Sequence, residues 1–204
     1  MNNTVTMEHA RAIMGSNMIG PAELDAVGFI KKDAKVPSIR FSADELERKK
    51  ADYLLVLGAD KLVNEKPMTI RSLLKVFGNN PDVMEPCFYN QDWYENETFI
   101  DYRLKNEWFL MRTEVYENSR GVQPDELVKI HIFPRAITCA YTFFVAWQSL
   151  GIKLWYHDFV WCSDTDHNGD RIYVGKYHDI DGVNKNGFSI HRHLSLRPCY
   201  GCID

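Results

Sequence analysis

The stretch that decides the fold is PRAITCAYTFFVAWQSLG, residues 134–151. Its apolar part, residues 136–150, is 15 residues long, whereas a helix that spans a membrane needs about 20. Pro134 suits the first turn of a helix, where its missing N–H is not needed, and Gly151 suits the position after the last turn. The stretch therefore predicts one apolar helix buried in a protein core, and we expect no membrane partner.

The composition of the chain changes at Gly151. Beyond it there is no Glu and no Ala, but there are seven Asp and five of the chain's seven His. Loss of good helix formers together with a gain of turn residues favours strands and hairpins. Residues 153–162 and 171–177 are predicted to form a hairpin around Asn168-Gly169, a dipeptide typical of tight turns. Residues 188–194 are predicted as a third strand.

The chain before residue 134 carries start and stop signals of short helices. Thr6, Ser42 and Thr69 are suitable N-caps for three of them. The predicted helices are 7–14, 21–27, 70–77, one from 124, and one that starts after Ser42 and runs through Leu46 to about Lys50. Strands are predicted at 53–57 and 108–111. We therefore predict a single α+β domain of residues 1–204, helix-rich over 1–150 and rich in strands and hairpins over 151–204. Its apolar helix is expected to pack on a C-terminal antiparallel sheet.

Charge and cysteine content narrow the classes of partner and compartment. The chain has 24 basic and 28 acidic residues, a net charge of −4, and its basic residues form no large cluster. Since binding to a polyanion depends on clustered Lys and Arg, we expect no nucleic-acid partner. The five cysteines are an odd number, and several lie in apolar stretches. Together with an N-terminus unlike a secretory signal, they predict reduced thiols and a cytoplasmic location.

A first candidate site lies in the aromatic and acidic segment 88–101. Asp92, Trp93, Tyr94 and Glu97 place aromatic rings beside carboxylates. Such a combination suits a sugar or another small polar ligand, and paired acids can act in general acid–base catalysis. The alternative is a solvated loop whose aromatic side chains fix it to the core.

A second candidate is the loop 164–170, which reads DTDHNGD. Asp164, Asp166 and Asn168 occupy the first, third and fifth positions of a calcium-binding loop, followed by a glycine and Asp170. The twelfth position is Gly175, where such a loop has a bidentate Glu, and the flanks are predicted strands. The alternative is therefore a polar hairpin loop.

A third candidate, an alternative zinc site, combines His191 and His193 with Cys199 and Cys202. On a strand, residues two apart point to the same face, so both imidazoles are expected on one side. Two histidines and two cysteines form a valid tetrahedral zinc set. The alternative is a strand with exposed histidines and a C-terminal turn with incidental thiols. Zinc and calcium are thus the two cofactors that the sequence suggests.

The opening of the chain, HARAIMGSN at 9–17 and GPAEL at 20–24, resembles the start of a family of uncharacterised bacterial proteins. The resemblance covers mainly this segment. It implies no activity, cofactor or site residue.

The chain lacks a G-x-S-x-G elbow, a Gly-rich phosphate loop and an H-E-x-x-H motif. We therefore expect a cytoplasmic, non-enzymatic binding or protein-interaction domain with a protein or small-molecule partner. The alternative is a hydrolase-like enzyme that uses the acids of segment 88–101, assisted by a metal ion from loop 164–170. This alternative requires the two segments to share one site.

Overall fold

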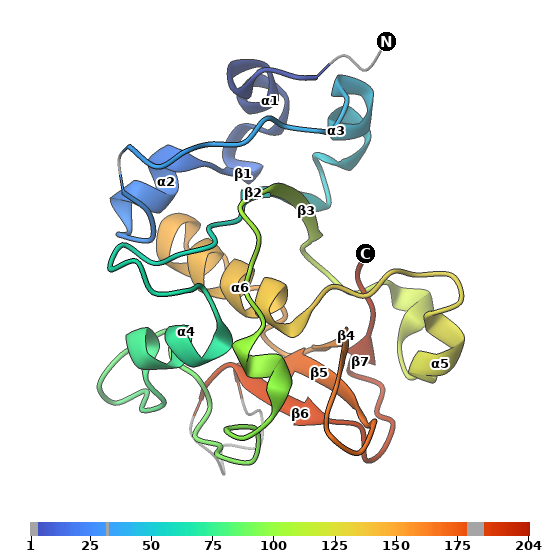
Figure 1. Ribbon diagram of the computed structural model, residues 1–204. Helices are drawn as coiled ribbons and strands as arrows, with labels where there is room; N and C mark the ends of the chain where they lie inside the picture. Colours follow the sequence, from blue (N-terminus) through green and yellow to red (C-terminus); the bar gives the residue numbers. More distant parts are fainter. Residues whose placement is uncertain (1–3, 32, 179–185) are drawn as a thin grey trace.

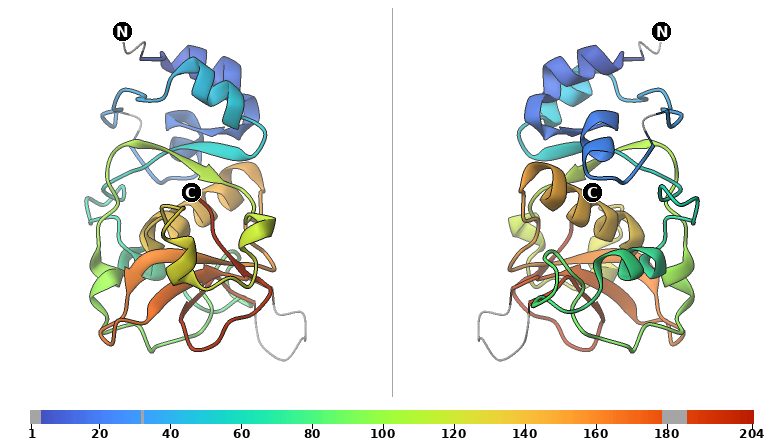
Figure 2. Two further views of the ribbon diagram at one scale, coloured as in Figure 1. Left: turned by 90° about the vertical axis from the view of Figure 1, so that its right-hand side faces the viewer. Right: turned by 90° about the vertical axis from the view of Figure 1, so that its left-hand side faces the viewer.

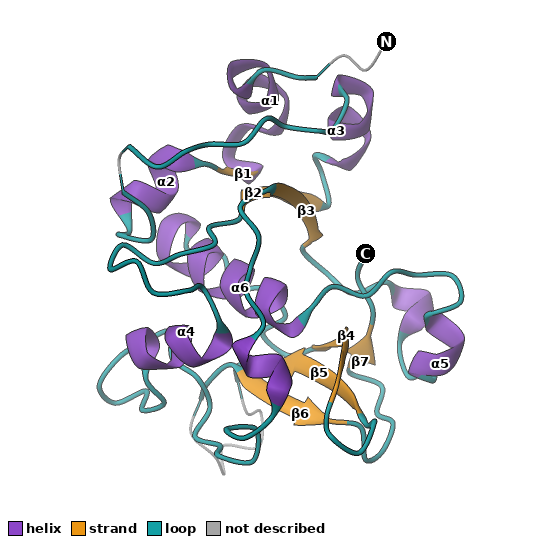
Figure 3. Ribbon diagram, viewed as in Figure 1, coloured by secondary structure: helices purple, strands orange, loops and turns teal. Residues whose placement is uncertain are grey.

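The computed structural model describes residues 4–31, 33–178 and 186–204, and the fold is of the α+β class. Two sheets, of three and four strands, lie on opposite sides of the helix α6 (Ala136–Leu150) (Figure 1). The side views of Figure 2 show the same order of layers: short helices, the smaller sheet, α6 and the larger sheet. Figure 3 separates the helices and strands by colour. The predicted α+β class is confirmed.

Helix α6 is buried because it is apolar on all sides. Ten of its 15 residues are buried, and a helix without a polar face must be covered all round. It packs against the strand β1 on one side and against β4 and β5 on the other. Tyr141, in its middle, donates its hydroxyl to the carbonyl oxygen of Leu57 at 2.9 Å. Within the described residues, no helix combines the length and hydrophobicity needed to cross a membrane.

The smaller sheet has the strand order β1 (Met18–Ile19), β2 (Tyr53–Leu57) and β3 (Trp108–Arg112). β1 runs parallel and β3 antiparallel to β2. All five residues of β2 are buried, as expected for a continuous apolar strand between two neighbours. Segment 53–57 was identifiable from its sequence, but the two-residue strand β1 is too short for a period-two pattern.

The short helices begin where their caps predict. α1 (Met7–Met14), α3 (Ala43–Lys49) and α4 (Ile70–Phe77) each begin after a Thr or Ser whose side-chain oxygen accepts a backbone N–H. α2 (Pro21–Ala26) and α5 (Pro124–Leu127) begin at prolines. The 3₁₀ turns η1 (Gly15–Asn17), η2 (Thr98–Asp101) and η3 (Glu117–Ser119) were not predicted.

The larger sheet has the strand order β6 (Ser189–Arg192), β5 (Arg171–Gly175), β4 (Phe159–Thr165) and β7 (Tyr200–Gly201). β4, β5 and β6 are antiparallel, but β7 pairs with β4 in parallel, so the sheet is mixed. The first arm of the hairpin begins at Phe159 rather than at residue 153. A turn occupies the intervening residues, where Trp155 has a φ of 45°.

The two faces of the larger sheet belong to different cores. The inward face contributes its aliphatic residues to the main core around α6. The outward face carries aromatic residues that form a second, smaller core: Phe159, Trp161, Tyr173 and Tyr200. The period-two alternation of side chains along each strand separates the two sets.

Candidate functional site

Segment 88–101 runs along the edge of the larger sheet and is held there by β6. The indole N–H of Trp93 donates to the carbonyl of Ile190 at 3.0 Å, and the N–H of Ile190 donates to the Gln91 side chain at 3.2 Å. Further along, Arg71 of α4 donates to Asp101 at 2.8 and 3.0 Å. The segment thus covers the exposed edge of the sheet, which would otherwise offer unpaired backbone groups.

Most aromatic side chains of this segment are therefore structural. Tyr94 is fully buried and Trp93 is half-buried, so Tyr94 offers no face to a ligand from solvent. Burial also raises the pKa of Tyr94. Asp92 is exposed and Glu97 is 7% exposed. Of the four residues predicted here as ligand-binding, Glu97 has the surroundings most suggestive of a site.

The hairpin between β4 and β5 places its tip next to Glu97. The tip is a three-residue loop. The N–H of Asp166 donates to the carbonyl of Asp170 at 2.9 Å, and the N–H of Gly169 donates to the carbonyl of Asp166 at 3.0 Å. The φ of 87° at Gly169 suits glycine. One carboxylate oxygen of Asp166 accepts the N–H groups of Asn168 and Asp170, both at 2.9 Å. This side-chain-to-backbone turn fixes the direction in which the next residue, His167, points.

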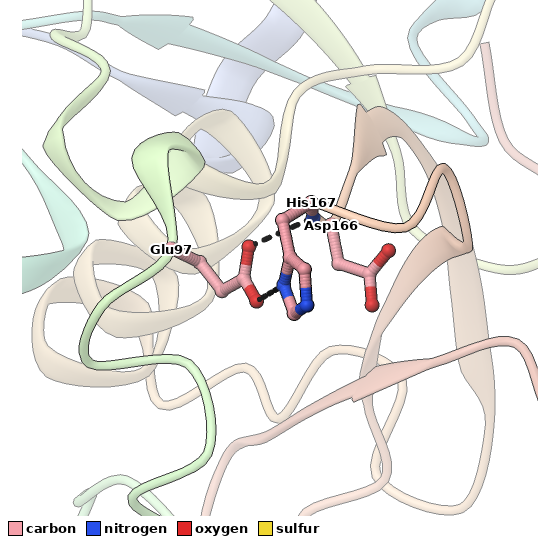
Figure 4. Close-up of side chains that lie close together, drawn as sticks. All are labelled: Glu97, Asp166 and His167. Carbon is pink, nitrogen blue, oxygen red and sulfur yellow. Dashed lines mark hydrogen bonds and ion pairs between the residues drawn. The ribbon is translucent and has the colours of Figure 1, made fainter.

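Glu97 holds His167 through two hydrogen bonds. Its carboxylate accepts the backbone N–H of His167 at 3.0 Å and lies 2.6 Å from the imidazole Nδ1. The imidazole Nδ1 faces the Glu97 carboxylate, and Nε2 does not contact that carboxylate. The side chain of His167 is 66% exposed. In the view of Figure 4 the imidazole lies between the carboxylates of Glu97 and Asp166.

Glu97, Asp166 and His167 form the group that we call the carboxylate–histidine cluster. One ligand-type atom from each lies within 4.8 Å of the other two. Among the residues that the structure describes, no other three His, Cys, Asp or Glu are grouped this closely. The cluster joins segments separated by 70 positions in the chain.

Asp166 is the most enclosed member of the cluster. Its side chain has no exposed surface, and its second oxygen accepts from Arg192 at 3.2 Å. Burial acts to raise its pKa, but the hydrogen bonds from the loop N–H groups and from Arg192 outweigh burial, so its pKa is lowered. Asp166 is therefore held as a carboxylate.

The predicted calcium loop does not converge on one point. Asp164 points to α6, where one oxygen accepts the N–H of Ala136 at 2.6 Å and the other lies 3.7 Å from Arg135. It stabilises the start of that helix, and burial raises its pKa. Asn168 is exposed and Asp170 half-buried. The structure groups Asp166 with Glu97 and His167 instead, and the loop is the polar hairpin of the alternative interpretation.

The predicted zinc set is likewise spread over the larger sheet. His191 and His193 share one face as expected: His191 stacks on Tyr173 with ring centroids 5.4 Å apart, and His193 meets Trp161 at 5.1 Å. Cys199 and Cys202, however, flank β7, which lies at the opposite edge of the sheet from β6. Burial raises the pKa of both thiols, which disfavours the thiolate that zinc requires.

The sequence analysis did not identify His167 or Arg192 as site residues. His167 lies inside the quoted loop, and a histidine directly after Asp166 in a predicted turn was the available signal. Arg192, between His191 and His193, gave no signal of its pairing with Asp166, because that contact depends on strand register.

No family model matches the chain, and searches of curated proteins and of solved structures find no match either. The resemblance of residues 9–24 to a bacterial family therefore stays a prediction.

Proposed function

We propose that this protein is a binding domain that holds a divalent metal ion of the zinc type with Glu97, Asp166 and His167. The observation that carries the proposal is the 4.8 Å grouping of their ligand atoms. Zinc binds carboxylate oxygen and imidazole nitrogen at about 2.1 Å, so tetrahedral ligands lie roughly 3.4 Å apart. The small contraction required falls mainly on His167, whose side chain is the most exposed of the three.

The charge of the cluster and the contact of Asp166 with Arg192 favour a metal ion as the ligand. The two carboxylates bring negative charge together, which a divalent cation neutralises. The Asp166–Arg192 contact supports one ligand from behind, as outer partners of metal ligands commonly do.

Zinc titration by calorimetry, with elemental analysis of the loaded protein, tests this function. We expect one zinc per chain for the unaltered protein and at least about tenfold weaker binding for His167→Gln, since loss of one ligand costs 1.4 kcal/mol or more. His9→Gln is the matched control, because it removes an exposed histidine far along the chain from the cluster. Equal zinc affinity in the His167→Gln and His9→Gln variants contradicts the proposal.

A metal-assisted hydrolase is the second candidate. The observation that favours it is the contact between segment 88–101 and loop 164–170, which that hypothesis requires. Three protein ligands would leave the fourth zinc position for water, as in catalytic zinc sites. Zinc-dependent cleavage of p-nitrophenyl acetate or bis-p-nitrophenyl phosphate, lost in Glu97→Gln, supports it. Zinc binding without turnover of either substrate leaves the non-enzymatic binding domain.

We also propose that the protein resides in the cytoplasm and has no nucleic-acid partner. All five cysteines have free thiols, which suits the reducing cytoplasm. The net charge of −4 continues to argue against a nucleic-acid partner. A protein partner stays a prediction.

A further inference from the structure

A second candidate site lies at the carboxyl end of β2, away from the residues of the carboxylate–histidine cluster. A cavity of about 360 Å³ opens where β2 ends at Leu57 and is walled by residues 30–31, 33–35 and 57–62, with Glu65 and Asn106. An adjoining cavity of about 330 Å³ shares Asp60, Lys61 and Asn106 with it. Volumes of this size are typical of small-molecule sites. We call the two together the β2 cleft.

The β2 cleft has the opposite charge to the chain as a whole. Its lining contains five basic residues and three acidic ones, a surplus of two positive charges, whereas the chain has 24 basic and 28 acidic residues. The basic residues are Lys31, Lys35, Lys61, Arg103 and Lys105, and the acidic ones are Asp33, Asp60 and Glu65. A surplus of one sign of charge in a cleft favours ligands of the other sign.

Part of this positive charge has no acidic partner. Lys31 and Lys61 both contact Glu65, at 2.5 and 3.3 Å. For Lys35, Arg103 and Lys105, no ion pair exists with any carboxylate in residues 4–31, 33–178 or 186–204. Lys35 lines the first cavity, and Arg103 and Lys105 line the adjoining one.

The walls of the cleft are tied together in advance of any ligand. The side-chain amide of Asn106 donates to the carbonyl of Lys35 at 3.0 Å, and the indole of Trp108 donates to Pro37 at 2.9 Å. The N–H of Gly58 donates to the carbonyl oxygen of Glu107 at 2.9 Å. A Cβ at Gly58 would lie 2.5 Å from the carbonyl oxygen of Lys105. A preformed site loses less conformational entropy on binding.

We propose that the β2 cleft binds a small molecule that carries a phosphate group, with Lys35, Arg103 and Lys105 as the main contacts to the phosphate. Lysines act as point charges toward phosphate oxygens, and several of them are needed to balance a dianion. Lys61 and Asn106, which line both cavities, contact the rest of the ligand.

Pyrophosphate and inorganic phosphate are the probes for this proposal, measured by calorimetry in a chelator-containing buffer with sodium chloride matching the ionic strength. The test variant is Lys35→Glu combined with Lys105→Glu. The matched control is Lys75→Glu combined with Lys129→Glu, which changes the net charge equally at exposed lysines outside the cleft. We expect the test variant to bind pyrophosphate at least about tenfold more weakly than the control does.

If both double variants bind pyrophosphate equally weakly, the proposal is overturned. That result would show that the net charge of the whole molecule, rather than the cleft, attracts the anion. Failure of the unaltered protein to bind either probe at millimolar concentration also overturns it. The His167→Gln variant separates this site from the proposed metal site: it is expected to keep its pyrophosphate affinity. Loss of that affinity in His167→Gln assigns the anion to the carboxylate–histidine cluster and sinks the β2 cleft as its site.

Discussion

The carboxylate–histidine cluster and the outward aromatic face of the larger sheet contain the same kinds of metal-ligand residue and use them differently. At the hairpin tip, His167 is exposed and paired with a carboxylate. On the aromatic face, His191 and His193 pack against tyrosine and tryptophan rings. The comparison teaches that a histidine's role follows from its neighbours in space: carboxylates make it a candidate ligand, and rings make it part of a core.

The largest expected effect is the loss of Trp161 from the aromatic face. Its side chain is fully buried, with its ring 5.3 Å from that of Tyr173 and 5.6 Å from that of Tyr200. Trp161→Ala should lower the free energy of unfolding by about 3–5 kcal/mol, since it removes a large buried ring and leaves a cavity. Urea unfolding measures the effect.

Trp161→Phe is the control for that change, because it keeps an aromatic ring at the site and removes an indole N–H that has no hydrogen-bond partner. A destabilisation below about 1 kcal/mol in Trp161→Ala would show that the outward face is no true core.

Next in size is the effect of Asp166, which organises the hairpin tip. Asp166→Ala removes the acceptor of two loop N–H groups and of Arg192, and should cost about 2–3 kcal/mol near neutral pH. Asp170→Ala, in the same loop, should cost less than about 0.5 kcal/mol because its side chain is not the acceptor. Urea unfolding of the two variants side by side provides the check.

The Asp166 effect should also depend on pH. The folded pKa of Asp166 lies below its unfolded value, so its contribution to stability is present above about pH 4 and is lost as the pH falls through the folded pKa. The difference between the unaltered protein and Asp166→Ala should therefore shrink in strong acid. A constant difference down to about pH 2 would mean that the carboxylate's charge is irrelevant.

A third effect appears only on acidification and concerns His191. Burial lowers the pKa of His191 to about 4, with further lowering by the positive charges of Lys176 and Arg197. The unfolded chain takes up this proton near pH 6.5 and the folded chain does not, so stability should fall as the pH drops from about 6.5 to 4. His191→Phe should remove this loss, whereas His9→Phe should keep it. An NMR titration midpoint of His191 near 6.5 would contradict the buried environment.

The smallest expected effect is that of the C-terminal thiols on zinc content. Cys199→Ser combined with Cys202→Ser should leave the zinc stoichiometry unchanged, because these residues flank β7 at the edge of the sheet opposite β6. Elemental mass spectrometry of the purified double variant measures it. Loss of zinc from this variant would assign the metal to the histidine–cysteine set, and the carboxylate–histidine cluster would then not be the metal site.

Local signals in the sequence were sufficient for most secondary structure. Capping residues such as Thr6 and Ser42 marked helix starts, and Asn168-Gly169 marked the hairpin. The strands β1 and β7 lacked such signals because each is two residues long and exists only through pairing with a neighbour. The parallel placement of β7, which makes the larger sheet mixed, followed from that pairing.

The sequence by itself determined the α+β class, the buried position of helix 136–150 and the hairpin at 164–170, because these depend on apolar content, periodicity and turn residues within short windows. Only the tertiary structure decided which polar residues meet. Glu97 and His167 come together because segment 88–101 covers the β6 edge, and basic side chains gather at the β2 cleft from segments that are far apart in the chain. Contacts of this kind depend on strand order and edge packing, which no local pattern of residues encodes.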